Sequence, residues 1–411
     1  MKNEIDQLMN DAGIDALLIV GAAQHNPYMV YLTGGGHITN ADLIKKAGEK
    51  AFLFHGPMER DEAAKTGLNT CSYDQYPFTG YLQKANNDHV DAYALRYHDL
   101  LIHSGVHGGR IALYGKTDIG AKFAIFQRLH QLFPQYTITG LVPDTILLKA
   151  MMRKEPSEIE CIRAMGKITT KVVGKVAHFL SCQKVRNGFL VDEQEQPVTI
   201  GFVKSKINYW LSEAGAENPA QTIFAIGRDA GVPHSQGNPD DLLELGKTIV
   251  FDIFPCESGG GYFYDFTRTW CLGYAPDEVQ ALYEQVKRVY NRVVSSLKVN
   301  SVFKQYQKMT CELFEEMGHP TLLNTPSTLQ GYVHSLGHGL GLHIHEMPFS
   351  GATATEDEIL APGSVFTIEP GLYYPDKGFG IRLEDTYYVA NDGTIEKMVD
   401  YPMDLVIPIK K

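Results

Sequence analysis

The segment HSLGHGLGLHIHE, which spans His334–Glu346, combines histidines with glycines at close spacing. Imidazoles bind metal ions and transfer protons near neutral pH. Glycines let the backbone approach a ligand closely, because they carry no side chain. His334, His338 and His345 are therefore candidate functional residues, and the other sequence features are considered in relation to this segment.

Acidic residues in apolar, strand-like surroundings lie on both sides of that segment, namely Asp252, Asp265, Glu369 and Glu384. Asp252 lies within VFDIF and Glu369 follows VFTI, so neither carboxylate has an easy route to water. Carboxylates are almost never fully buried without a partner, because desolvating the charge costs several kcal/mol. Lys and Arg are scarce near either residue in the sequence, so we expect a bound cation.

Four carboxylates that converge in one pocket would repel one another and raise one another's pKa. Two divalent ions would balance their four negative charges. With His338 as the single nitrogen ligand, the predicted donor set suits manganese, cobalt, iron or zinc. A pair of such ions can bind a hydroxide and stabilise the oxyanion that forms when the hydroxide attacks a carbonyl.

Composition limits the classes of protein to consider. The chain has 411 residues, which predicts two domains, and its 44% hydrophobic and 21% charged residues are typical of a soluble globular protein. The net charge of -11 argues against a nucleic-acid partner. No stretch approaches the ~20 apolar residues that cross a membrane. The N-terminal residues lack a secretory pattern and the six cysteines lack a C-x-x-C pair, so we expect a cytoplasmic protein with reduced thiols.

Strand and helix patterns alternate over residues 1–150, which predicts an α/β domain. Its first strands are expected at DALLIVG (15–21), MVYL (29–32) and KAFLFHG (50–56). A charged connector follows, in which Pro156 is placed to begin a helix with Glu158 in its first turn. We therefore expect a second, catalytic domain over residues 151–411.

The chain resembles the pita-bread metallopeptidases, the family of methionine aminopeptidase, aminopeptidase P and prolidase, and within it the Xaa-Pro branch. The motifs that carry the resemblance are, in order, VFDIF, FYDFTRT, HSLGHGLGLHIHE, TIEPGLY and GIRLED. The resemblance implies a creatinase-like α/β domain over residues 1–150. It also implies an α+β catalytic domain of the pita-bread, creatinase/aminopeptidase type over residues 151–411.

The family's roles transfer by position. The resemblance implies five metal ligands: Asp252, Asp265, His338, Glu369 and Glu384. Asp265 and Glu384 match the pair that bridges both ions, and Glu369 also matches the residue that accepts a proton from the nucleophile. His345 matches a histidine that contacts the scissile carbonyl or the leaving nitrogen. His234 matches one that lines the substrate cleft. His334 and Arg382 match positions that contact either the metal ligands or the carboxylate of the substrate.

The implied activity is a manganese-dependent Xaa-Pro aminopeptidase, with cobalt, zinc or iron as alternative metals. Its substrate would be a peptide with proline at the second position, and the family resemblance implies a homodimer. From charge and composition we expect no nucleic-acid or membrane partner. A prolidase, which cleaves Xaa-Pro dipeptides, shares every motif and is the main alternative. A lyase on the same metal site and a non-catalytic peptide-binding module are more remote alternatives.

Overall fold

The computed structural model describes residues 4–409, in which the chain forms two compact units. The first comprises Met1–Met151 and Gly259–Gly261, and the second comprises Met152–Ser258 and Tyr262–Lys411. Among the described residues, no helix is both long enough and apolar enough to cross a membrane. Each unit has its own hydrophobic core.

The first unit is built on a six-stranded mixed sheet with the strand order β4-β3-β2-β1-β5-β6. The pairs β1–β5, β5–β6 and β3–β4 are parallel, whereas β2 is antiparallel to β1 and β3. The strands are β1 (Ala16–Val20), β2 (Ala41–Lys46), β3 (Phe52–His55), β4 (Asn69–Ser72), β5 (Gly109–Gly115) and β6 (Tyr136–Thr139).

Helices cover both faces of this sheet. Side chains alternate along β1, so Leu17 faces a core with α1, α2 and α7, and Leu18 faces a core with α5 and α6. Every residue of β1 is buried, as the apolar run ALLIV predicts for a strand covered on both faces. The helices are α1 (Glu4–Asp11), α2 (Pro27–Thr33), α3 (Arg60–Lys65), α4 (Phe78–Lys84), α5 (His89–His103), α6 (Ile119–Leu132) and α7 (Leu147–Met151).

The prediction of a strand at MVYL is wrong, because these residues lie in α2. Pro27 stands in the first turn, where its missing N–H leaves no helical hydrogen bond unmade. Gly34 ends the helix in the left-handed conformation, and its N–H donates to the carbonyl of Val30. A short apolar run fits a strand or a buried helix equally well by periodicity, and these flanking residues favour the helix.

The second unit contains two larger sheets, ordered β10-β11-β13-β21 and β15-β14-β16-β19-β20. The strands of the first are β10 (Ile223–Ile226), β11 (Thr248–Ile253), β13 (Phe266–Leu272) and β21 (Val406–Ile407). Those of the second are β14 (His338–Gly339), β15 (Glu346–Phe349), β16 (Val365–Ile368), β19 (Asp385–Val389) and β20 (Ile395–Lys397). Two-stranded sheets are formed by β7 (Lys184–Arg186) with β8 (Phe189–Val191), β9 (Ala216–Glu217) with β12 (Cys256–Glu257), and β17 (Gly371–Tyr374) with β18 (Phe379–Arg382).

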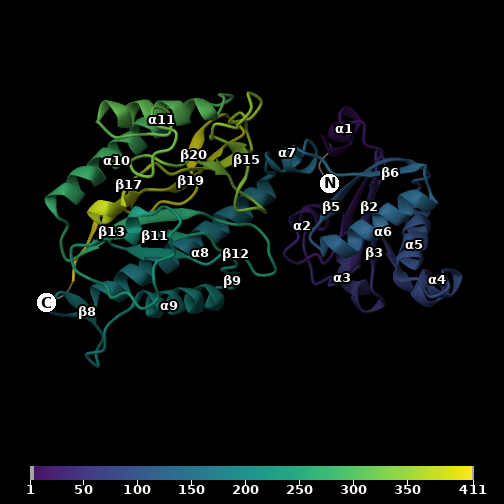
Figure 1. The fold of residues 1–411 in the computed structure, drawn as a ribbon, viewed down its shortest axis with the longest axis horizontal. Coiled ribbons are helices and arrows are strands. Elements are labelled where there is room, and N and C mark those ends of the chain that lie inside the picture. The colour runs from purple at the N-terminus through teal and green to yellow at the C-terminus, as the bar shows by residue number, and fades with distance from the viewer. Residues whose placement is uncertain (1–3, 410–411) are drawn as a thin grey trace. The chain divides into compact units, whose positions relative to one another are not determined.

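Long helices cover these sheets. Helices α8 (Pro156–Ser181) and α9 (Ile200–Glu213) share a core with β10, β11 and β13, whereas α10 (Asp277–Ser296) and α11 (Lys304–Glu316) share a core with β16, β17 and β18 (Figure 1). Helix α8 begins at Pro156 as predicted, with a capping box between Glu155 and Glu158. Short 3-10 helices are η1 (Pro57–Glu59), η2 (Tyr73–Gln75), η3 (Asp229–Gly231) and η4 (Pro375–Lys377).

Candidate metal centre and active site

The acidic side chains predicted as ligands meet where strands of the second unit begin or end. Asp252 lies inside β11, whereas Asp265 directly precedes β13, Glu369 directly follows β16 and Glu384 separates β18 from β19. The sequence expectation that all four lie within strands is therefore corrected. Pairing still brings them together, because β11 places Asp252 opposite Thr267, and an isolated bridge pairs Thr267 with Glu384.

A buried cluster of carboxylates surrounds one imidazole. Candidate ligand atoms of Asp265, His338 and Glu384 all lie within 4.8 Å of one another. His338 Nε2 lies 3.5 Å from Asp265 Oδ2 and 3.5 Å from Glu369 Oε1. Asp252 belongs to the same charge cluster, since its carboxylate is the second cause, after burial, of the raised pKa of Glu384. The structure thus brings all five sequence-predicted ligands together.

Electrostatics make this cluster unfavourable without added positive charge. Burial, followed by the neighbouring carboxylate of Glu384, raises the pKa of both Asp265 and Glu369 well above their usual values. Burial and Asp252 raise the pKa of Glu384 to about 8. Burial lowers the pKa of His338 to about 3, and the repulsion that a protonated His345 would exert contributes in the same direction. His338 is therefore neutral and supplies no compensating charge.

Unpartnered oxygens show that the cluster fits a divalent cation. Asp252 Oδ1, Asp265 Oδ1 and Glu384 Oε1 are buried and have no hydrogen-bond partner among residues 4–409. His338 donates from Nδ1 to the carbonyl of Gly339 at 3.0 Å, which leaves the Nε2 lone pair facing the carboxylates. Oxygen donors with one imidazole nitrogen suit borderline divalent ions rather than a soft metal.

Arg382 holds Asp252 in place, a contact that the sequence did not reveal. Its Nη2 donates to Asp252 Oδ2 at 2.6 Å and its Nη1 donates to the Tyr373 hydroxyl at 2.7 Å. The Tyr373 hydroxyl in turn lies 2.9 Å from His334 Nε2, while His334 Nδ1 donates to the carbonyl of Ser335. Arg382 is only 2% exposed and its donors are engaged, which favours a positioning role over direct contact with a substrate carboxylate.

Tyr373→Phe tests this hydrogen-bond chain. The variant removes the donor to His334 Nε2 and leaves Arg382 Nη1 with the Pro233 carbonyl, at 3.2 Å. We expect the free energy of unfolding to fall by about 1–3 kcal/mol, because buried polar groups lose their partner. Denaturant unfolding would measure the change, with Tyr209→Phe as the control, since Tyr209 is 65% exposed. Equal stability of both variants would contradict the chain of contacts.

The two remaining histidines also lie at the cluster. The ring centroid of His345 is 4.3 Å from that of His338, with the rings almost perpendicular. Burial and then the charge of His234 lower the pKa of His345, so a neutral imidazole stands beside the carboxylates. His234 lies in the loop between η3 and β11, next to Pro233, whose carbonyl accepts from Arg382. These positions are compatible with the predicted contacts to substrate.

A buried ion pair stabilises the end of the histidine-rich segment His334–Glu346. Lys154 Nζ contacts Glu346 Oε1, and their side chains are 1% and 0% exposed. Glu346 also accepts from the backbone N–H of His343 at 3.3 Å. A Cβ at Gly341 would lie 2.5 Å from the Glu346 carboxylate, which explains why glycine stands there. Glu346 adjoins His345, so this pair anchors the strand that follows a candidate catalytic residue.

Lys154→Met should therefore destabilise the protein strongly. Removing one partner leaves the Glu346 carboxylate buried and uncompensated, which typically costs about 3–5 kcal/mol. Scanning calorimetry should show a large fall in Tm for this variant and partial recovery in the Lys154→Met/Glu346→Gln double variant. The control is Lys175→Met, whose partner Glu213 is 53% exposed. If both single variants lose the same stability, the buried pair has no special role.

Buried carboxylates with unpartnered oxygens, beside neutral imidazoles, form the kind of site that is found in metal-dependent hydrolases. The profile of metallopeptidase family M24 matches residues 160–391, which is more than half of the chain. The chain belongs to metallopeptidase family M24. Members of the family depend on divalent metal ions, in agreement with the donor set of the cluster.

Sequence relatives cover different shares of the chain. The Xaa-Pro dipeptidase of Pyrococcus furiosus is 30% identical over 251 residues, which are 61% of this chain and 64% of that enzyme. The chain thus spans less than two thirds of that relative. The probable dipeptidase PepE of Mycobacterium tuberculosis is 28% identical over 408 residues, which are 97% of this chain and 93% of that protein.

Solved structures share the fold over almost the whole chain. The prolidase of Pyrococcus horikoshii OT3 has a TM-score of 0.73 at 23% identity, covering 98% of both chains. The X-Pro aminopeptidase of Thermotoga maritima MSB8 has a TM-score of 0.73 at 23% identity, covering 97% of this chain and 99% of that one. The predicted fold, an α/β domain followed by a pita-bread domain, is confirmed.

Proposed function

We propose that this peptidase is an exopeptidase that cleaves the bond before a proline at the second position of a peptide. The observation that supports it most is the buried cluster of Asp252, Asp265, His338, Glu369 and Glu384, which would hold two divalent ions. Manganese is the expected metal, with cobalt, zinc or iron as alternatives. When bound, such ions act as Lewis acids on the scissile carbonyl and make water nucleophilic near neutral pH.

Glu369 is proposed as the group that moves the proton. Its side chain is 15% exposed, against 6% for Asp265, so it can reach a water molecule at the edge of the cluster. A carboxylate at this position can accept the proton of the attacking water and later pass it to the leaving nitrogen. Glu369 would therefore act first as a base and then as an acid.

Two histidines are proposed to contact the substrate. His345 has a lowered pKa and is expected to be neutral, so it can donate one hydrogen bond to the oxyanion without bringing a full charge. His234 would line the cleft beside it. His334 and Arg382 are proposed to act mainly through Tyr373 and Asp252, by keeping the ligand oxygens in position.

The bond before proline is the proposed target because several similar proteins carry names that refer to this bond. Proline lacks the amide N–H that many peptidases grip, so its cleavage requires a dedicated site. The names divide between an Xaa-Pro dipeptidase in Pyrococcus furiosus and an X-Pro aminopeptidase in Thermotoga maritima. The sequence predicts release of a residue from longer peptides, and hydrolysis of Xaa-Pro dipeptides is the second candidate.

Hydrolysis of matched peptides tests the proposal. Ala-Pro and Ala-Pro-Ala-Ala would be incubated with the Mn(II)-loaded protein and after chelation, with Ala-Ala and Ala-Ala-Ala-Ala as controls. Cleavage of the proline tetrapeptide after its first residue would identify an aminopeptidase, whereas cleavage of Ala-Pro alone would identify a dipeptidase. Failure on both proline peptides, or rates that chelation leaves unchanged, would contradict the proposal. The lyase and peptide-binding alternatives would then be tested.

The assembly and location of the protein stay predictions. We expect a homodimer in the cytoplasm, and light scattering of the purified protein would measure its mass in solution. No nucleic-acid or membrane partner is proposed.

A further inference from the structure

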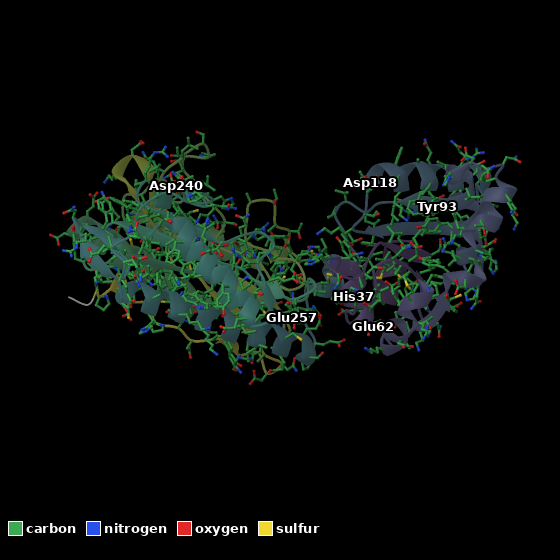
Figure 2. All side chains as sticks on the ribbon, turned by 90° about the horizontal axis from the view of Figure 1, so that it is seen from below. His37, Glu62, Tyr93, Asp118, Asp240 and Glu257 are labelled. Carbon is green, nitrogen blue, oxygen red and sulfur yellow. The ribbon has the colours of Figure 1, made fainter. Side chains whose placement is uncertain are left out.

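The first unit contains a small polar pocket that is separate from the carboxylate cluster. It lies between α5, α6 and the segments that carry Asp42 and Tyr73, and its volume is about 220 Å³. Its polar walls include Asp42, Tyr73, Arg96, Tyr97 and Lys122. Figure 2 labels Tyr93 on this unit, together with Asp118, which caps the N-terminus of α6.

The acidic group of the pocket is matched by hydroxyls. Asp42 is 7% exposed and accepts from the Tyr97 hydroxyl at 2.8 Å through Oδ1 and from the Tyr73 hydroxyl at 2.7 Å through Oδ2. Burial and then the charge of Asp42 raise the pKa of both tyrosines, so each hydroxyl stays protonated and remains a donor. Each carboxylate oxygen of Asp42 therefore accepts a hydrogen bond from a tyrosine, and these bonds involve neither Arg96 nor Lys122.

The basic groups of the pocket keep free donors. The Arg96 guanidinium stacks over the Tyr73 ring at 4.0 Å, and its buried Nε has no hydrogen-bond partner among residues 4–409. Lys122 Nζ donates to the Tyr97 hydroxyl at 2.5 Å, which occupies one of its three N–H groups. Two positively charged side chains therefore line a pocket that contains one carboxylate.

We propose that this pocket binds a compact organic carboxylate, with its carboxylate group on Arg96 and Lys122 and its apolar part against Tyr93, Leu100 and Ile125. The flat fork of a guanidinium pairs well with a planar carboxylate, and the stacking on Tyr73 fixes the plane of the Arg96 fork. The apolar wall favours a ligand with a hydrocarbon body over inorganic phosphate. The small volume restricts that body to about ten non-hydrogen atoms.

Calorimetric titration of the full chain with benzoate tests this site, because benzoate combines a carboxylate with a small ring. We expect saturable binding of one benzoate to the pocket. Arg96→Gln and Lys122→Gln should each weaken binding by about tenfold or more, because each removes a charged donor. Arg60→Gln is the matched control, since Arg60 is 73% exposed in the same unit and does not line the pocket.

The remaining outcomes would overturn the proposal. Absence of saturable benzoate binding would do so, as would wild-type affinity in both pocket variants, which would place benzoate elsewhere on the protein. Inorganic phosphate that binds more tightly than benzoate would contradict the assignment to a carboxylate with an apolar body. Circular dichroism would check that each variant is folded, and the Lys122→Gln variant tests the site independently of Arg96→Gln.

Discussion

A Glu369→Gln variant is expected to lose at least about a thousandfold in kcat/KM on an Xaa-Pro substrate, because it removes the proposed proton carrier and one metal ligand. Glutamine keeps the size of the side chain, so the loss would reflect chemistry rather than packing. The raised pKa of Glu369 comes first from burial and second from Glu384, and glutamine can no longer titrate. Initial rates with the Mn(II)-loaded protein would measure the effect.

The matched control for this variant is Glu356→Gln. Glu356 is 76% exposed and pairs with Lys304 away from the cluster, so kcat/KM should stay within about twofold of the wild-type value. Near-normal turnover by Glu369→Gln would contradict the proposed mechanism. An equal loss in the control would show that the assay reports general damage instead.

Removing metal is expected to lower Tm by at least about 5 °C, and by more at pH 8 than at pH 6. The pKa of Glu384 is about 8 in the metal-free fold, against 4.5 for a free glutamate, and the pKa values of Asp265 and Glu369 are also raised. Between these values the folded state holds more protons than the unfolded state. The stability of the metal-free protein therefore falls as pH rises through this range.

Scanning calorimetry after chelation, at pH 6 and pH 8, would measure this dependence. Asp265→Asn is the informative variant, because it removes one carboxylate from the cluster and should flatten the pH dependence of the chelated protein. If the chelated wild-type protein became more stable between pH 6 and pH 8, the result would contradict the raised pKa values of the buried acids.

The sequence was sufficient to predict which residues form the cluster. Asp252 and Glu369 stood out as acids in apolar runs, and His338 stood out within a glycine-rich segment. Asp265 and Glu384 were also noted as acids in strand-like surroundings, and the family resemblance added their role as the bridging pair. These predictions concern residue types in local contexts, which a single sequence displays directly.

The partners of those residues could not be predicted, because they lie far apart in the chain. Arg382 is 130 positions from Asp252, and Lys154 is 192 positions from Glu346. A single sequence contains no signal for such pairings, which depend on the packed sheets. Asp252 was detectable as a charge in an apolar setting that requires a partner, and the family resemblance named Arg382, but the pair of Lys154 and Glu346 was not predicted. For Asp252 a metal was predicted, and the structure adds Arg382.

Short apolar segments do not determine their own secondary structure. MVYL has no period long enough to separate a strand from a buried helix, and it forms part of α2. The longer patterns of α8 and β11 were predicted well, since Pro156 marks the start of α8 and IVFDI is continuously apolar except for the candidate ligand.

Metal content tests the central claim most directly. The protein would be reconstituted with Mn(II), freed of loosely held ions by gel filtration, and analysed by inductively coupled plasma mass spectrometry beside the Asp265→Asn and Glu384→Gln variants. We predict about two divalent ions per wild-type chain and a loss of at least one in each variant, together with loss of hydrolysis. A wild-type chain that holds no divalent ion, or variants that retain the full complement, would contradict the assignment of this cluster as the metal centre.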